Sequence, residues 1–267
     1  MVDKENRLRR ILREGRPSMG TRMWGTWPFM IEAVGDTGNY DYVEYVAEYS
    51  PFSQSDLENM ARAAELHDMA LLMKVDFQNR GYVAQKAIAS GVQGILFTDC
   101  RNADEVRESI RLVKPETEAD GGCFGYPNRR YIGFQPHLTQ QEHARRQREI
   151  LLAFMIEKRS AMEEIEEICS VPGVDMVQFG PSDYCMSRGW DLKDHREEAR
   201  AEERRMIETA LRHGVAPRCE IRTPEEAAYY RELGVRHFCL GDELKYLQER
   251  WREDGGRLRK MLKEEGQ

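Results

Sequence analysis

Hydrophobic residues along this chain gather in short runs rich in β-forming residues. These runs alternate with longer stretches whose apolar positions recur at helical spacing. The alternation repeats along the whole chain, which predicts a regular succession of strands and helices. The predicted strands span residues 23–29, 42–49, 71–76, 91–98, 151–157, 175–180, 216–221 and 237–241.

Residues at the ends of the helical stretches support this interpretation. Glycine, the residue that most often ends a helix, stands just before a strand four times, at Gly91, Gly173, Gly214 and Gly234. N-capping residues precede other helical stretches, at Ser53, Asn102 and Thr223. The boundaries therefore agree with the hydrophobic pattern.

Strands separated by helices pair in parallel, and eight of them close a (β/α)8 barrel. The alternative is an open, doubly wound sheet, which normally has a glycine-rich turn after its first strand. The chain has no such motif. We therefore expect residues 1–267 to form a single α/β domain of the TIM-barrel class.

Three segments depart from the repeat. Residues 1–16 predict an amphipathic helix that covers the bottom of the barrel. The insertion at residues 113–139 predicts an ordered lid or interface loop, with a mobile surface excursion as the alternative. Residues 242–263 predict a C-terminal helical extension with a break at Gly255-Gly256. An exposed Trp251 on that extension would indicate a subunit contact, whereas a buried one would pack on the barrel.

The composition is that of an ordinary globular protein, with 40% hydrophobic and 33% charged residues among 267. The net charge of −7 argues against binding nucleic acid through its phosphates. No apolar run is long enough for a membrane span, and no secretory signal is evident at the N-terminus. The six cysteines are widely spaced, as in reduced intracellular proteins, so we expect a cytoplasmic location.

The C-terminal ends of barrel strands carry the active site in this fold. Carboxylates dominate those positions, and several of them around one mouth repel each other unless a cation joins them. Oxygen ligands of this kind select Mg²⁺ or Mn²⁺. The candidate residues are Trp24, Trp27, Glu48, Tyr49, Lys74, Asp76, Asp99, Glu157, Asp183, Glu220, Arg222 and Asp242.

Two of these carboxylates are the strongest candidates. Glu157 ends an apolar run, where an unpaired ionised carboxylate would be costly. Its alternative role is a structural salt bridge to Lys158 or to another basic residue of the rim. Asp183 lies in a tight turn, Gly180-Pro181-Ser182-Asp183, whose N–H groups are able to cradle an anion, although it is also a suitable helix N-cap.

Taken together, Glu157 and the Gly-Pro-Ser-Asp turn resemble the metal-binding pair of the HpcH/HpaI aldolase family. These enzymes are class II pyruvate aldolases of the phosphoenolpyruvate/pyruvate-binding barrel superfamily. Residues 173–184 are similar to the strand-six signature of the family, and weaker similarities follow in order along nearly the whole chain. They lie at Trp24, 32–33, 41–43, 102–105 and 241–242.

The resemblance implies a mechanism. Glu157 and Asp183 would hold a divalent metal, Mg²⁺ or Mn²⁺ in the first place and Co²⁺ as a further option. A 2-oxo acid such as pyruvate would chelate this metal, with its carboxylate on the backbone of Gly180, Pro181 and Ser182. The metal would stabilise the enolate when an aldol bond to an aldehyde breaks or forms.

Two further side chains are candidates for binding the substrate. Trp24 lies after the first strand, at a position that resembles the family. Arg130, like its neighbour Arg129 in the insertion, would either clamp a second carboxylate on the aldehyde or solvate the loop.

The chain departs from the family at four positions. Tyr49 follows Glu48 where the family has the histidine of a Glu-His pair, and Lys74 replaces an arginine. Met155 replaces a glutamine, and Thr98 a proline.

These departures leave the general acid and base open. Lys74 supplies a positive charge, but without the planar fork of arginine. Tyr49 would serve as an acid only with a pKa well below about 10, and otherwise fills the space of the histidine ring. Glu48 and Asp76 are further candidates for the base.

The sequence therefore predicts a divalent-metal-dependent carbon–carbon lyase of the aldolase type, acting on a 2-oxo acid and an aldehyde. One alternative is other enolate chemistry, by a decarboxylase or a C–C hydrolase. Another is a catalytically retired barrel that serves as a binding or assembly subunit. The resemblance also implies a homo-oligomer, a trimer or a hexamer, with sites near the subunit edges.

Overall fold

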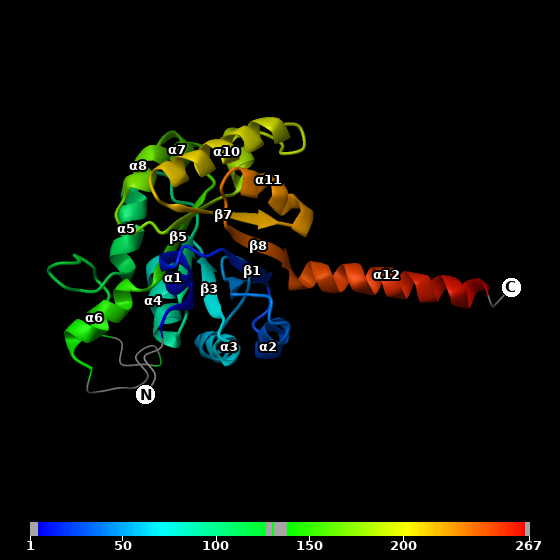
Figure 1. Ribbon diagram of the computed structural model, residues 1–267, viewed down its shortest axis with the longest axis horizontal. Coiled ribbons are helices and arrows are strands. Elements are labelled where there is room, and N and C mark those ends of the chain that lie inside the picture. The colour runs from blue at the N-terminus through cyan, green and yellow to red at the C-terminus, as the bar shows by residue number, and fades with distance from the viewer. Residues whose placement is uncertain (1–4, 127–129, 131–137, 265–267) are drawn as a thin grey trace.

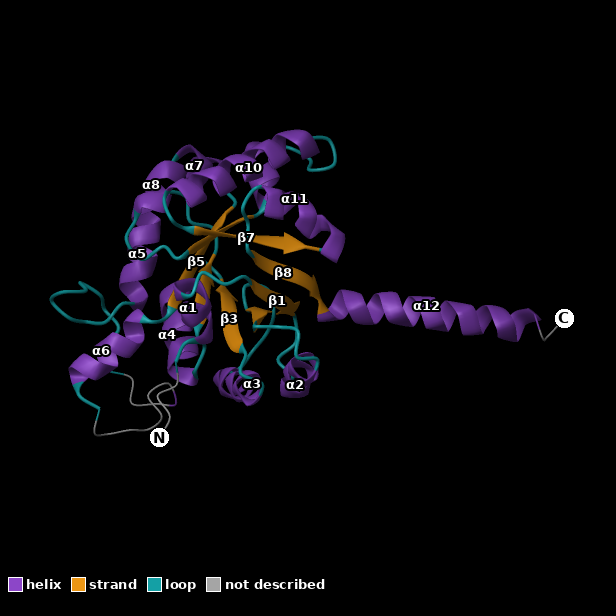
Figure 2. Cartoon of the chain, viewed as in Figure 1, coloured by secondary structure: helices purple, strands orange, loops and turns teal. Residues whose placement is uncertain are grey.

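The computed structural model describes residues 5–126, 130 and 138–264. Eight parallel strands pair in chain order, and β8 pairs with β1 to close the sheet. Helices surround this barrel (Figures 1 and 2). The expected (β/α)8 fold is confirmed, and the open sheet is excluded because its two edges would not pair. The strands are β1 Ser18–Met23, β2 Tyr42–Val46, β3 Ala70–Val75, β4 Gly94–Phe97, β5 Leu151–Ile156, β6 Met176–Phe179, β7 Ala216–Ile221 and β8 His237–Asp242.

The helices begin and end largely where the sequence signals predict. Ser53 forms a capping box with Asp56, and the side chain of Asn102 accepts the N–H of Glu105. The four glycines expected to end helices all have positive φ. The helices are α1 Arg7–Arg13, α2 Pro28–Asp36, α3 Gln54–Leu66, α4 Arg80–Ser90, α5 Ala103–Val113, α6 Gln140–Arg148, α7 Arg159–Glu163, α8 Ile165–Ser170, α9 Pro181–Arg188, α10 Arg196–Arg212, α11 Ala227–Glu232 and α12 Glu243–Glu264, with a 3₁₀ turn at Pro224–Glu226.

Two apolar cores stabilise the barrel. The larger one lies between the strands and the surrounding helices, and the smaller one fills the barrel interior. Leu8 of α1 is 1% exposed and belongs to the interior core, together with Leu72 and Leu96. The N-terminal helix therefore covers the bottom of the barrel, as its amphipathic pattern predicts.

The prediction of the first strand at residues 23–29 is wrong. The strand is β1, which ends at Met23, and α2 begins at Pro28. The pattern misleads because the inward positions of β1 are not apolar. They are Ser18, Gly20 and Arg22, and a side chain at Gly20 would overlap the ring of Tyr42. Proline is favoured at the first position of a helix, which explains where α2 starts.

The described residues of the long insertion do not cover the mouth of the barrel, so the interpretation of that part as a lid is wrong. A connection from a helix to the next strand lies at the bottom of the barrel, opposite the C-terminal strand ends. The described part packs there: Arg148 of α6 donates to Asp120 at 2.8 and 2.7 Å. Residues 127–129 and 131–137, including Arg129, lie outside the described residues. Its role as an interface loop stays a prediction.

The C-terminal extension is one continuous helix. α12 runs through Gly255 and Gly256, so the predicted break is wrong. Each glycine costs about 1 kcal/mol relative to alanine. Ion pairs four residues apart, such as Arg250–Asp254, help to offset that cost. The helix projects away from the barrel, and Trp251 is 66% exposed (Figure 1).

The six cysteines are free thiols. Within the described residues, no helix has the length and hydropathy required to cross a membrane.

Candidate active site

Five consecutive strands deliver charged side chains to one end of the barrel. Lys74 lies in β3, and the other residues follow β2, β4, β5 and β6 directly: Glu48, Asp99, Glu157 and Asp183. Carboxyl ends of parallel strands meet at the same end of a barrel, so these side chains share the mouth. The sequence placed all five among its candidates.

Glu157 is the most deeply buried of the four acidic residues at this mouth, with 2% of its surface exposed. Its Oε1 accepts the backbone N–H of Asp99 at 2.9 Å. Burial raises the pKa of the Glu157 carboxyl to about 7, although the nearby Lys74 ammonium opposes this shift. Burial thus disfavours the negative charge of this carboxylate, and an added cation would favour it.

The turn after β6 brings Asp183 next to this carboxylate. Gly180 is the N-cap of α9 and Pro181 its first residue, so Asp183 lies in the first turn and is not the N-cap. A Cβ on Gly180 would lie 2.6 Å from Oε2 of Glu157, which explains why glycine stands there. The Asp183 charge in turn raises the pKa of Glu157.

Lys74 and Glu48 form an ion pair beside Glu157. Lys74 Nζ lies 2.6 Å from Glu48 Oε2, with side-chain exposures of 11% and 6%. Burial opposes the charged form of Lys74, but Glu157 and Glu48 outweigh it and raise the lysine pKa. Lys74 is therefore a persistent ammonium rather than a base at neutral pH.

A second lysine, Lys158, lies at the mouth near Asp99 and Asp183. Lys158 follows Glu157 in the sequence, and its Nζ lies 2.5 Å from Asp99 Oδ1 and 4.0 Å from Asp183 Oδ1. The salt bridge that Lys158 forms is thus with Asp99, not with the adjacent Glu157.

The donor set of this mouth suits a divalent cation. Four negative and two positive side chains leave a formal charge of −2. Across residues 5–126, 130 and 138–264, no three His, Cys, Asp or Glu side chains form a complete metal site. Mg²⁺ is usually held by only one or two carboxylates, with water or substrate completing the shell. Glu157 and Asp183 supply two carboxylates, so the residues at this mouth suit a Mg²⁺ ion.

A buried polar network lines the other half of the barrel interior, and Glu220 is the one member of it named here that the sequence had predicted as a site residue. Arg218 donates to the Tyr42 hydroxyl at 2.7 Å and pairs with Glu44 and Gln178. Arg22 links Glu44 to the partly exposed Glu220. The signal was available, because Arg22, Glu44 and Arg218 each lie at a position of their strand that points inward.

Three predicted site residues have other roles at the rim. Asp76 accepts the N–H of Asn79 at 2.9 Å and so stabilises the turn before α4. The backbone N–H of Trp24 donates to Glu243, while its ring lies 5.8 Å from the guanidinium of Arg22. Tyr49 is 65% exposed, and burial of its hydroxyl together with Glu48 raises its pKa rather than lowering it. Pro181 and Ser182 are exposed at the mouth.

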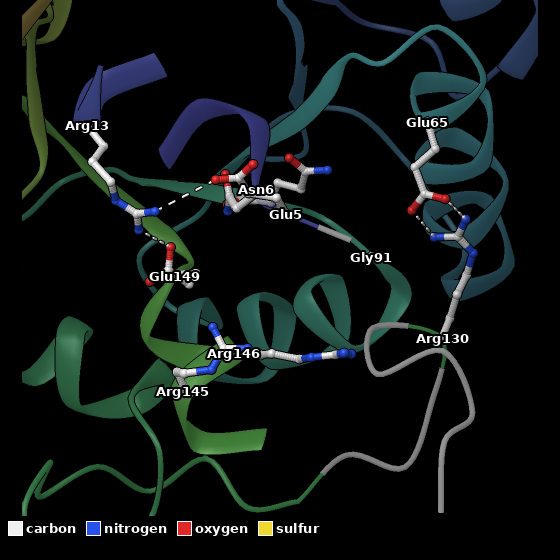
Figure 3. A pocket seen from close by; sticks show the side chains of 10 residues that line it. Glu5, Asn6, Arg13, Glu65, Gly91, Arg130, Arg145, Arg146 and Glu149 are labelled. Carbon is white, nitrogen blue, oxygen red and sulfur yellow. Dashed lines mark hydrogen bonds and ion pairs between the residues drawn. The ribbon is translucent and has the colours of Figure 1, made fainter. Parts of the chain in front are cut away.

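Arg130 is not at the mouth. It lines a cavity of about 420 Å³ at the bottom of the barrel, together with Gly91 and Arg146 (Figure 3). Its guanidinium donates to both carboxylate oxygens of Glu65, at 2.8 and 2.5 Å. The prediction that Arg130 contacts the substrate is wrong, because the insertion that carries it follows a helix and not a strand.

Known proteins resemble this chain in sequence and in fold. Residues 48–245, more than half of the chain, match the sequence model of the HpcH/HpaI aldolase/citrate lyase family. A hydroxypyruvate/pyruvate aldolase of Paraburkholderia phytofirmans is 24% identical over 91% of this chain and 93% of its own. A 4-hydroxy-2-oxo-heptane-1,7-dioate aldolase of Escherichia coli is 24% identical over 89% of this chain and 88% of its own. The crystal structure of a family protein from Burkholderia cenocepacia superposes with a TM-score of 0.82, at 22% identity over 95% of this chain and 99% of that one.

Proposed function

This chain belongs to the HpcH/HpaI aldolase/citrate lyase family, and we propose that it is a divalent-metal-dependent carbon–carbon lyase acting on a 2-oxo acid. The observation that carries the proposal is the buried Glu157, which lies with Asp183 at the C-terminal ends of two neighbouring strands, β5 and β6. Its neighbour Asp183 would supply the second carboxylate ligand, and Lys74 the positive charge near the oxygen that becomes negative in the reaction. Relatives named as aldolases of pyruvate and of a 2-oxo dioate support the substrate class.

Glu157 and Asp183 would hold the divalent metal. Carboxylate oxygens favour Mg²⁺ or Mn²⁺, with Co²⁺ as a third option. When bound, such an ion acts as a Lewis acid that polarises a carbonyl oxygen.

The protein would supply the rest of the electrostatics. The first turn of α9 presents free backbone N–H groups after Gly180, and these suit the carboxylate of a 2-oxo acid. Lys74 stays protonated and would donate a hydrogen bond toward the oxygen that gains negative charge. Glu48, paired with Lys74, is the candidate proton acceptor.

Tyr49 does not have the properties of a group that exchanges a proton with the aldehyde oxygen, which loses a proton in aldol cleavage and gains one in aldol addition. Its hydroxyl has a raised pKa and its side chain is mostly exposed. This observation favours a second candidate, the decarboxylation of a 2-oxo acid that carries a second carboxylate on the carbon next to its keto group, because CO₂ leaves from that carbon without taking up a proton. The bond to CO₂ or to the aldehyde carbon then breaks at the same carbon, and both reactions leave the electron pair there as an enolate.

The test is hydrogen exchange at the methyl group of pyruvate in D₂O, followed by NMR. We expect exchange with Mg²⁺, its loss with EDTA, and its loss in Glu157→Gln. Persistent exchange in EDTA or in that variant would contradict the assignment. Product analysis with 2-oxo acids and aldehydes then separates aldol cleavage from decarboxylation.

We also propose that the protein is a homo-oligomer, with a trimer or a hexamer as the candidate forms. Leu244, Trp251 and Leu258 recur every seven residues along α12 and are 47 to 66% exposed. The strand that precedes this helix, β8, is incompletely covered, unlike the fully buried β3. A helix from a second copy of the chain would cover both apolar surfaces.

A further inference from the structure

Lys158 places a positive charge at the edge of the proposed cation site. Its Nζ lies 4.0 Å from Oδ1 of Asp183, one of the two proposed metal ligands. The lysine stem is flexible, and the side chain is 22% exposed, so small torsional changes move the ammonium. Lys158 is thus an internal competitor for the carboxylate that the metal needs.

Asp99 forms the ion pair that keeps the Lys158 ammonium away from Asp183. Its Oδ1 lies 2.5 Å from Lys158 Nζ, much nearer than Asp183 does. Coulomb attraction falls with distance, so the ammonium favours Asp99 over Asp183 in this arrangement. The side chain of Asp99 thereby keeps Asp183 available.

The backbone of Asp99 contributes in a different way. Its φ of 58° lies in the left-handed region, which is unfavourable for a residue with a side chain. In this conformation its N–H donates to Oε1 of Glu157 at 2.9 Å. One residue therefore fixes Glu157 through its amide and Lys158 through its carboxylate.

We propose that Asp99 is a positioning residue that retains Lys158 and thereby sets the affinity of the mouth for a divalent cation. The inference rests on the proposed function, because it requires Glu157 and Asp183 to be the metal ligands. It goes further in assigning a role to two residues that bind neither metal nor substrate. Without the Asp99 charge, the nearest carboxylate for Lys158 is Asp183.

The test is a double-mutant cycle read by Mn²⁺ binding to the purified full-length protein, with free Mn²⁺ measured by electron paramagnetic resonance. Asp99→Asn keeps the amide and tolerates the left-handed conformation, but it removes the charge. Lys158→Met removes the ammonium and keeps an unbranched side chain. The cycle compares the effect of Asp99→Asn with Lys158 present and with Lys158 replaced.

We expect Asp99→Asn to weaken Mn²⁺ binding at least tenfold when Lys158 is present and at most threefold in the Lys158→Met background. Lys158→Met alone should bind Mn²⁺ as tightly as the wild type or more tightly. An equal loss in both backgrounds would overturn the proposal, since Asp99 would then act only through its own charge. So would unchanged binding in Asp99→Asn.

Failure of the proposed function gives a different result. In that case the wild type does not bind Mn²⁺, or Glu157→Gln binds it equally well, and the inference falls with it. Thermal unfolding followed by circular dichroism checks that each variant is folded. If Asp99→Asn unfolds, Asp99→Gly takes its place, because it also removes the charge, keeps the amide and adopts a positive φ without strain, and the same two losses of affinity are expected.

Discussion

The guanidinium of Arg218 on β7 pairs with the carboxylate of Glu44 on β2 inside the barrel, where their side chains are 1% and 0% exposed. Burial disfavours the Glu44 charge, but Arg218 and Arg22 outweigh this effect and lower its pKa to about 2. The pair thus stays ionised in the barrel interior. Its removal from water has a cost that only intact pairing offsets.

Replacing one partner should therefore be severe. We expect Arg218→Met to lower the free energy of unfolding by about 3 to 5 kcal/mol, because the buried Glu44 then keeps Arg22 alone as an ion-pair partner. The Tyr42 hydroxyl and the Gln178 amide also lose their hydrogen bonds to the guanidinium. Urea denaturation measures this change.

Arg212→Met is the matched control: Arg212 pairs with Glu166 on the surface, where an ion pair contributes about 0 to 1 kcal/mol. Equal losses in the two variants would show that the interior pair has no special role.

Lys74 and Tyr49 should differ in importance for the reaction proposed at the mouth. We expect Lys74→Met to reduce the rate of pyruvate hydrogen exchange at least 100-fold, because it removes the ammonium beside Glu157. Tyr49→Phe is the control and should stay within about threefold, since its exposed phenol has a raised pKa. Exchange rates from NMR under saturating Mg²⁺ give both values. A large loss in Tyr49→Phe would reinstate the tyrosine as the acid.

The barrel and most of its mouth were predictable from sequence, for identifiable reasons. Buried parallel strands are continuous apolar runs, so an acid at the end of one, such as Glu157, stands out. Arg22 and Glu44 were missed because their charges are neutralised across strands, by partners far away in the sequence. The error at Arg130 has a different cause: a charged residue in a loop gives no sign of which end of the barrel that loop lies on.

Gly180 should be irreplaceable for metal binding. Its φ of −109° is allowed for any residue, so Gly180→Ala introduces no backbone strain. The added Cβ would instead lie 2.6 Å from Oε2 of Glu157 and displace that carboxylate. We expect Mn²⁺ affinity to fall at least tenfold. Gly25→Ala, whose Cβ would lie 3.8 Å from Glu243, should leave the affinity unchanged.

The exposed stripe of α12 should govern assembly. We expect Leu258→Glu to shift the protein to smaller species in size-exclusion chromatography with light scattering, because a charge enters an apolar contact. Lys260→Glu changes a residue two positions along, on the opposite face of the helix, and should leave the mass unchanged. A monomeric wild type would contradict the proposed oligomer, and equal behaviour of the two variants would place its contact elsewhere.

His237 should make the protein sensitive to mild acid. The ring is buried at the bottom of the barrel, where its Nδ1 lies 2.9 Å from the Ser18 hydroxyl. Burial, assisted by the positive charges of Arg236 and Arg218, lowers the pKa of His237 from 6.5 to about 4. Above pH 6.5 the ring is neutral in both the folded and the unfolded chain, so it has no effect on stability. Below that pH only the unfolded chain takes up the proton, and stability falls until the pH reaches about 4.

The measurement is urea denaturation at pH 7 and pH 5, for the wild type and for His237→Asn. Between these two values the histidine should cost about 2 kcal/mol of unfolding free energy, a loss that His237→Asn lacks. Carboxylates that titrate in the same range contribute equally to both proteins, so they cancel in the difference. Parallel losses in the two proteins would mean that the folded chain accommodates the charged ring.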